Sequence, residues 1–219
     1  AVNAHLKHGT TSIYPTLSSS TIPTIEAACN VCEKLMAEEN SPVLGLHIEG
    51  SYINPKEAGA QNPVLIKAPV IYEYETLLSK YKCIKRWDEA PELPGSVRFI
   101  KTCNMHGVLT ALTCTRATYK DVVEAHKAGM THAAHFYNAM PVVYKEHEFK
   151  VPGTVESVYA MQDMTVEVIA DGKLKHFPLM TALLCHLDFK LCHRRLVRRK
   201  HDVFEIEILT CAGKVLYLK

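Results

Sequence analysis

VLGLHIEG, residues Val43 to Gly50, is the stretch that decides the fold. Pro42 precedes it and Gly50 closes it, so the apolar run between them is typical of a short buried strand that ends in a histidine and Glu49. Taken alone, Glu49 is equally well explained as a loop acid at a strand end. The carboxyl end of a strand is also where a barrel of alternating strands and helices places its chemistry. The stretch therefore predicts a buried strand that carries a candidate functional carboxylate.

A second stretch has the same design. THAAHFYNAM, Thr131 to Met140, again runs a short apolar strand into polar groups, here His132, His135 and Asn138. Two strands that each end in metal-capable side chains predict one shared site, because parallel strands present their carboxyl ends at the same edge.

Strand-like and helix-like segments alternate along the chain. The spacing predicts helices over residues 24–39 and 73–82, and a strand over residues 107–113. Thr118 followed by Asp121 resembles a capping box, and Gly129 is a suitable helix stop, so a further helix is expected between them. A polar loop is expected between THAAHFYNAM and VPGTVESVYAMQD, the latter a candidate helix. The alternation of strands and helices favours an α/β fold with parallel strands.

Six segments of the chain carry a resemblance to a known family. They are HGTTSIYPTL (His8 to Leu17), GLHIEGSYINPKEAGAQ (Gly45 to Gln61), APE (Ala90 to Glu92), ATY (Ala117 to Tyr119), THAAHFYNAM, and IADG (Ile169 to Gly172). In order and spacing they resemble the N-acetylglucosamine-6-phosphate deacetylases of the amidohydrolase superfamily, over roughly residues 5 to 183.

The resemblance implies the fold and the domain organisation. It implies a TIM-type (β/α) barrel of the metal-dependent amidohydrolase kind. The first barrel strand and the small β domain of the family would precede residue 1, so both are expected to be lacking here. We expect a partial amidohydrolase barrel over residues 1–183 and a divergent C-terminal segment over residues 184–219.

A metal site is implied by the same resemblance. In the family a divalent metal, zinc in our expectation, is held by the glutamate of the EG motif and by two histidines. Glu49 and His135 match two of these positions, and Cys114 stands where the other histidine is expected. A thiolate can ligate zinc, so Cys114 is a candidate third ligand. The alternative is that Cys114 is a small buried residue.

Some of the positions that contact substrate in the family are kept in this chain, and others are replaced. The resemblance implies that Ala60, Gln61, Asn138, Ala139 and His147 contact the sugar phosphate, with Gln61 and His147 replacing the family's histidine and arginine. The resemblance implies that the family's substrate-contacting histidine and its catalytic aspartate are replaced by Leu174 and by Cys211. Asp171 is a turn acid or a catalytic group, so no catalytic residue is assigned.

Composition narrows the class of protein and its compartment. The chain has 219 residues, 47% of them hydrophobic, with a net charge of +2 and eight cysteines. This charge gives no reason to expect nucleic acid or a membrane as a partner, and no apolar run reaches the length of a membrane span. Cys29 and Cys32 lie on one apolar helix face, so we expect reduced core thiols and a cytoplasmic protein.

Two functions follow from these observations. The first is a deacetylase that hydrolyses the N-acetyl group of an amino-sugar phosphate to glucosamine 6-phosphate and acetate, acting as a homodimer as in the family. The second is a catalytically inactive, truncated family member that at most binds a sugar phosphate. Intact motif order favours the first, and the replacements at residues 114, 174 and 211 favour the second.

Overall fold

The computed structural model of the chain describes residues 6–7, 10–167 and 169. The chain divides into two units, one of residues 1–11 with 167–219 and the other of Ser12–Val166. All the helices and strands given below lie in the second unit, whose fold is described by itself. The expected segment 184–219 lies outside the described residues, as do Asp171, Leu174 and Cys211.

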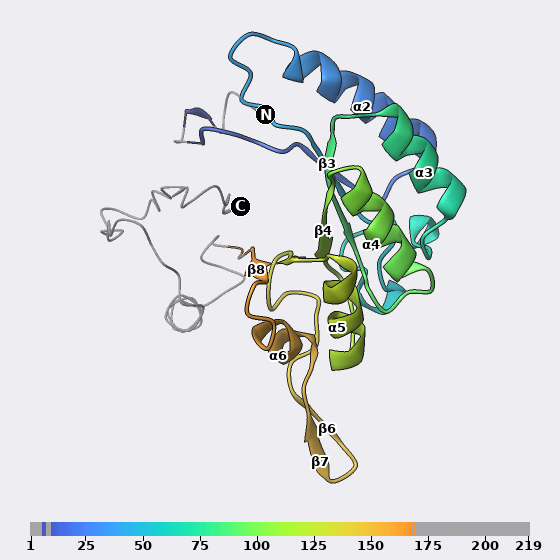
Figure 1. Ribbon diagram of the computed structural model, residues 1–219, viewed down its shortest axis with the longest axis vertical. Helices are drawn as coiled ribbons and strands as arrows, with labels where there is room; N and C mark the ends of the chain where they lie inside the picture. The colour runs from blue at the N-terminus through green and yellow to red at the C-terminus, as the bar shows by residue number, and fades with distance from the viewer. Residues whose placement is uncertain (1–5, 8–9, 168, 170–219) are drawn as a thin grey trace. The chain divides into compact units, whose positions relative to one another are not determined.

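A six-stranded parallel sheet forms the centre of this unit (Figure 1). Its strands are β1 (Thr16–Ser18), β2 (Leu46–Glu49), β3 (Ile84–Glu89), β4 (Leu109–Leu112), β5 (His132–Ala133) and β8 (Thr165–Val166). They lie side by side in chain order, and every neighbouring pair is parallel. All six carboxyl ends therefore lie along one edge of the sheet, and the predicted α/β class with parallel strands is confirmed.

Helices alternate with these strands along the chain. They are α2 (Ile22–Met36), α3 (Ile71–Lys80), α4 (Ser96–Met105), α5 (Tyr119–Ala128) and α6 (Thr154–Tyr159). Figure 1 shows α2 to α5 arranged along one face of the sheet. Among the described residues, no helix combines the length and the apolar character that crossing a bilayer requires.

Local sequence signals explain where the helices begin and end. The Asp121 carboxylate accepts a hydrogen bond from the Thr118 N–H at 2.8 Å, which completes the predicted capping box of α5. Gly129 ends this helix with a φ of 110°, a left-handed conformation that glycine adopts without strain. In α2, Cys29 and Cys32 are buried and carry free thiols, so their predicted place in the core is confirmed.

An aromatic cluster packs between the sheet and the helices α3 and α4. Trp87 of β3 stacks on Tyr52, with ring centroids 5.5 Å apart and planes 9° apart. Phe99 and Tyr74 meet these rings edge-on, and all four side chains are buried. The indole Nε1–H of Trp87 donates to the carbonyl of Gly50 at 2.8 Å. The core is thereby joined to the residue that follows Glu49.

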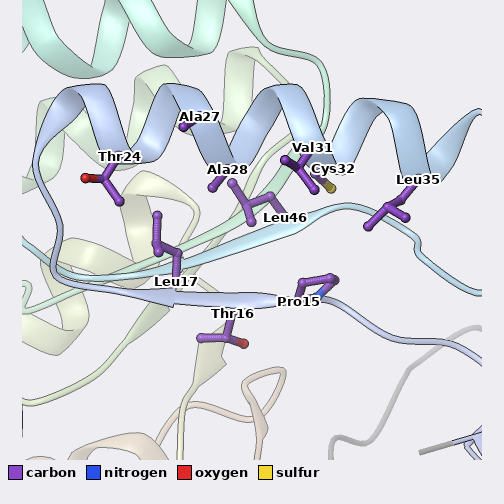
Figure 2. A pocket seen from close by; sticks show the side chains of 10 residues that line it. All are labelled: Pro15, Thr16, Leu17, Thr24, Ala27, Ala28, Val31, Cys32, Leu35 and Leu46. Carbon is purple, nitrogen blue, oxygen red and sulfur yellow. The ribbon is translucent and has the colours of Figure 1, made fainter. Parts of the chain in front are cut away.

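An apolar cavity of about 390 Å³ lies between α2 and β1, at one end of the sheet (Figure 2). Leu17, Ala28 and Leu46 lie between the helix and the strand, whereas Thr16 points away from α2. None of its lining residues was predicted to bind metal or substrate.

The face turned away from α2 carries a buried polar layer. Thr16 Oγ1 lies 2.9 Å from His47 Nδ1, and His47 Nε2 lies 3.0 Å from a carboxylate oxygen of Asp88. Arg86 donates two hydrogen bonds to the same carboxylate, at 2.6 and 2.7 Å. Burial acts to raise the pKa of Asp88, but Arg86 and His47 outweigh it and hold the pKa well below its usual range. The buried charge is therefore compensated.

His132 extends this layer onto β5. Its Nδ1 lies 2.7 Å from Thr165 Oγ1, and its Nε2 has no hydrogen-bond partner among the described residues. Burial, aided by the nearby Arg86 cation, lowers the pKa of His132 to about 3. The side chain is therefore neutral at pH 7.

The low pKa of His132 predicts a loss of stability in mild acid. Because the unfolded histidine titrates near 6.5 and the folded one near 3, folding loses stability as the pH falls from above 6.5 toward 3. Between pH 7 and pH 5 we expect this residue to account for about 2 kcal/mol. Urea unfolding of the wild type and of His132→Gln at both pH values measures the difference. Equal pH dependence of the two proteins would contradict the assignment.

A two-stranded antiparallel hairpin lies where the sequence indicated only a polar loop. Its strands are β6 (Tyr144–Glu146) and β7 (Phe149–Val151), and Figure 1 shows it extending from the α5 and α6 side of the sheet. The strands are short and mostly exposed, so they lack the apolar alternation that marks a half-buried strand. The loop interpretation of this segment was therefore wrong.

Candidate metal centre

Three strand ends deliver the predicted metal-capable side chains to one place. Glu49 is the last residue of β2, while Cys114 and His135 each follow the end of their strand, β4 and β5, by two residues. One ligand atom from each of the three lies within 4.8 Å of the other two. Cys114 and His135 are buried, and Glu49 is largely buried. The convergence expected from the two sequence stretches is present.

The backbone at these strand ends takes conformations that non-glycine residues rarely adopt. Cys114 has a φ of 40°, His135 of 32° and Ala139 of 52°. Each lies in the left-handed region, which costs a residue with a side chain about 1–3 kcal/mol. Such residues persist where the surrounding contacts fix them, and they gather at functional sites more often than elsewhere.

The ring of His135 has a defined orientation. Its Nδ1 lies 3.0 Å from the carbonyl oxygen of Asn138, which can only accept, so Nδ1 carries a proton. Nε2 then faces the cluster, 3.4 Å from Glu49 Oε1 and 3.9 Å from Cys114 Sγ. A histidine whose second nitrogen is held by a carbonyl is the usual arrangement of a metal ligand.

In the absence of a metal, the cluster favours a protonated imidazole. Burial acts to lower the pKa of His135, but its contacts with Cys114 and Glu49 outweigh burial and raise the pKa to about 10. Thr113 Oγ1, a position the sequence did not single out, lies 2.7 Å from the same Nε2. A metal ion would replace the proton and this hydroxyl contact at Nε2.

The donor set fits a zinc ion. Zinc binds thiolate, imidazole and carboxylate at about 2.0–2.3 Å, which in a tetrahedral site separates ligand atoms by roughly 3.3–3.8 Å. The two distances from His135 Nε2, 3.4 and 3.9 Å, are close to this range, and all three ligand atoms lie within 4.8 Å of one another. Three protein ligands also leave a fourth position for water or substrate, as in catalytic zinc sites.

Gln61 lies beside the end of β2 and is held in one orientation by Ser19. The Ser19 N–H and its hydroxyl both donate to Oε1 of Gln61, at 3.0 and 2.5 Å. Because a backbone N–H can only donate, the accepting atom must be the amide oxygen. A Cβ built on Gly50 would lie 2.5 Å from Ser19 Oγ and 3.1 Å from Gln61 Oε1. The glycine after Glu49 thus leaves room for this pair.

The other predicted substrate residues fall into two groups. Asn138 and Ala139 follow His135 in the same turn and are half-buried. Ala60 lies in the exposed loop after β2, next to Gln61. His147 is exposed in the turn between β6 and β7, with a φ of 53°. The first four therefore lie in strand-end loops, whereas His147 lies in the hairpin.

The geometry defines the class of the protein: an α/β chain whose candidate metal site lies at the carboxyl edge of a parallel sheet. No family model matches the chain. Curated relatives do: the N-acetylglucosamine-6-phosphate deacetylase of Bacillus subtilis (strain 168) is 30% identical over 194 residues, covering 81% of this chain and 45% of the relative. The N-acetylgalactosamine-6-phosphate deacetylase of Escherichia coli O157:H7 is 27% identical over 184 residues, covering 82% and 47%.

Solved structures agree with these relatives. The crystal structure of N-acetylglucosamine-6-phosphate deacetylase from Pasteurella multocida matches with a TM-score of 0.74 and 26% identity, covering 80% of this chain and 45% of that one. The chain is thus a relative of the N-acetylglucosamine-6-phosphate deacetylases, and the resemblance predicted from its motifs is confirmed. It spans about half the length of the curated relatives it matches.

Proposed function

We propose that this protein is a metal-dependent hydrolase that converts N-acetylglucosamine 6-phosphate to glucosamine 6-phosphate and acetate. The observation that carries the proposal is the meeting of Glu49, Cys114 and His135 at one strand edge. The names of the relatives supply the substrate class. Because two relatives are named for the galactosamine sugar, both epimers are candidates.

In the proposed site, Glu49, Cys114 and His135 hold a divalent metal, for which zinc best suits the thiolate. When bound, such a metal polarises an amide carbonyl and lowers the pKa of water. The carbonyl of Asn138 keeps His135 in the tautomer that leaves Nε2 available. The burial of Cys114 and His135 keeps bulk water from competing for the site.

The strand-end loops bind the sugar phosphate in this proposal. Ser19 holds the Gln61 oxygen, so the Gln61 amide N–H groups are left to donate to the substrate. The side chain of Asn138 and the backbone of Ala139 face the phosphate, with Ala60 beside Gln61. In a homodimer, His147 of the hairpin contacts the phosphate of the substrate that is bound by the partner chain. Its imidazole binds phosphate more weakly than an arginine does.

The finer fold belongs to the same proposal. We take the six parallel strands as part of a TIM-type barrel of the amidohydrolase kind, because such a barrel gathers all its strand ends at one mouth. A cytoplasmic location, with no nucleic acid or membrane as partner, remains our prediction.

A catalytically inactive relative that binds only a sugar phosphate is the second candidate. The contact that favours it is the one between Thr113 and His135, because the hydroxyl lies 2.7 Å from Nε2, the nitrogen that a metal would need. The cysteine at residue 114 also departs from the histidine that the motif leads us to expect. Under this candidate, Cys114→His should raise the zinc content.

Elemental analysis and an acetate-release assay on the purified 219-residue chain test the proposal together. We expect about one zinc per chain, since the three ligands form one site, and acetate release from one of the two amino-sugar phosphates. Zinc without acetate from either sugar would remove the activity but keep the site. Neither zinc nor acetate in the wild type, with zinc gained in Cys114→His, would establish the inactive candidate.

A further inference from the structure

Glu92 lies where three loops of the candidate site meet. It follows β3 by three residues, and β3 lies between β2 and β4 in the sheet. The loop after β3 is therefore flanked by the loop that follows Glu49 and by the loop that contains Cys114. The side chain is half-buried between them.

The Glu92 carboxylate accepts three hydrogen bonds from these flanking loops. Oε1 accepts from Asn54 Nδ2 at 2.8 Å and from the N–H of Arg116 at 2.7 Å, while Oε2 accepts from Thr115 Oγ1 at 2.5 Å. Hydrogen bonds to an ionised acceptor are the strong ones in proteins. One side chain thus ties the loop after β2 to the loop after β4.

The same residues continue the network through the backbone on both sides of Cys114. The Asn54 N–H donates to the Cys114 carbonyl at 3.0 Å, and the Thr115 N–H donates to the Ala139 carbonyl at 3.0 Å. Glu92 therefore contacts both Asn54, which donates to the Cys114 carbonyl, and Thr115, which donates to the Ala139 carbonyl.

The backbone of Cys114 needs hydrogen bonds of this kind to hold its conformation. Its φ of 40° is unfavourable for a residue with a side chain, so the conformation persists only where neighbouring contacts fix it. Without that conformation, the thiol would leave the position in which Sγ lies 3.9 Å from His135 Nε2.

We infer that Glu92 is a positioning residue, which fixes the loop of Cys114 so that the thiol meets Glu49 and His135. The inference rests on the proposed metal site for its functional meaning. Glu92 makes its three hydrogen bonds with residues other than the candidate ligands. Its effect passes through Asn54, Thr115 and Arg116.

Glu92→Ala tests this role, with Glu92→Gln as the conservative variant and Glu73→Ala as the matched control. Glu73 is also half-buried and accepts two hydrogen bonds, from Tyr52 and Lys67, and neither donor lies in the loop of Cys114. Glutamine keeps an accepting oxygen for Asn54 and Arg116, and its amide can donate to Thr115 Oγ1.

Zinc affinity is measured by competition with a chromophoric chelator on the 219-residue chain. We expect Glu92→Ala to weaken zinc affinity about 10- to 100-fold, which is the usual effect of losing a residue that orients a metal ligand without binding the metal. Glu92→Gln should stay within about threefold of the wild type, and Glu73→Ala should leave the affinity unchanged. Equal weakening in Glu92→Ala and Glu73→Ala would mean a general loss of stability and would overturn the inference.

Hydrogen exchange on metal-free protein separates this inference from the proposed function. We expect the amide protons of Asn54, Thr115 and Arg116 to exchange at least about tenfold faster in Glu92→Ala, with those of α3 unchanged. If Glu92→Ala shows this faster exchange while the wild type binds no zinc, the positioning of the loop is supported and the metal site is rejected. Unchanged exchange at these three amides would overturn the inference whatever the metal does.

Discussion

Glu49→Gln is expected to abolish both zinc retention and acetate release. Glutamine has the shape of glutamate but no charge, and its amide supplies a weaker ligand than a carboxylate. Loss of a residue that only orients a ligand weakens metal binding about 10- to 100-fold. Loss of a ligand itself should weaken metal binding by more than about 100-fold. In the metal-free protein the carboxylate lies 3.4 Å from His135 Nε2, so the variant also loses this ion pair.

Elemental analysis after dialysis and the acetate assay measure this effect. Glu75→Gln is the control, because the Glu75 side chain is 44% exposed and forms a surface ion pair with Arg98, a kind of pair that contributes little to stability. A Glu49→Gln protein that keeps one zinc per chain would show that the metal lies elsewhere. A Glu75→Gln protein that loses zinc would show that the assay reports overall charge.

Trp87→Ala is expected to remove most of the stability of the sheet unit. The indole is 1% exposed, stacks on Tyr52 and meets Phe99 edge-on. Loss of a buried aromatic ring costs about 3–5 kcal/mol. The carbonyl of Gly50 also loses the Nε1–H donor, which adds about 1–3 kcal/mol. The free energy of unfolding of a domain is typically about 5–15 kcal/mol, so these losses would remove most of it.

Urea unfolding followed by circular dichroism measures this loss, because the chain has one tryptophan and the variant removes its fluorescence. Trp87→Phe keeps an aromatic ring but not the N–H, so we expect an intermediate loss. Tyr72→Ala, at a residue 79% exposed, should change stability by no more than about 0.5 kcal/mol. A Trp87→Ala protein as stable as Tyr72→Ala would contradict the role given to the indole.

Short-range signals account for the parts of the fold that the sequence predicted. Thr118, Asp121 and Gly129 bound α5 because capping and left-handed glycine depend on neighbouring residues alone. The stretch ending at Glu49 reads as a strand because its apolar residues and flanking Pro42 and Gly50 are local. The β6–β7 hairpin was missed because its exposed strands carry no core-facing alternation.

The candidate site divides in the same way. Glu49, Cys114 and His135 were found from strand ends and motif order, and the structure brings them together. Glu92 and Ser19 were not found, because their roles depend on partners 23 and 42 residues away in the chain. Contacts of that span are set by tertiary packing, so the APE segment marks Glu92 as part of a motif without indicating its role, and nothing in its segment marks Ser19.

The three candidate ligands come from the carboxyl ends of three separate strands, β2, β4 and β5, and this has a thermodynamic consequence. A chain that has lost its sheet has no preformed cluster, so any zinc bound there binds the native state alone. Free zinc at about 100 times its dissociation constant would then add about 2.7 kcal/mol to the unfolding free energy. By linkage, the melting temperature of this protein would act as a gauge of the metal supply around it.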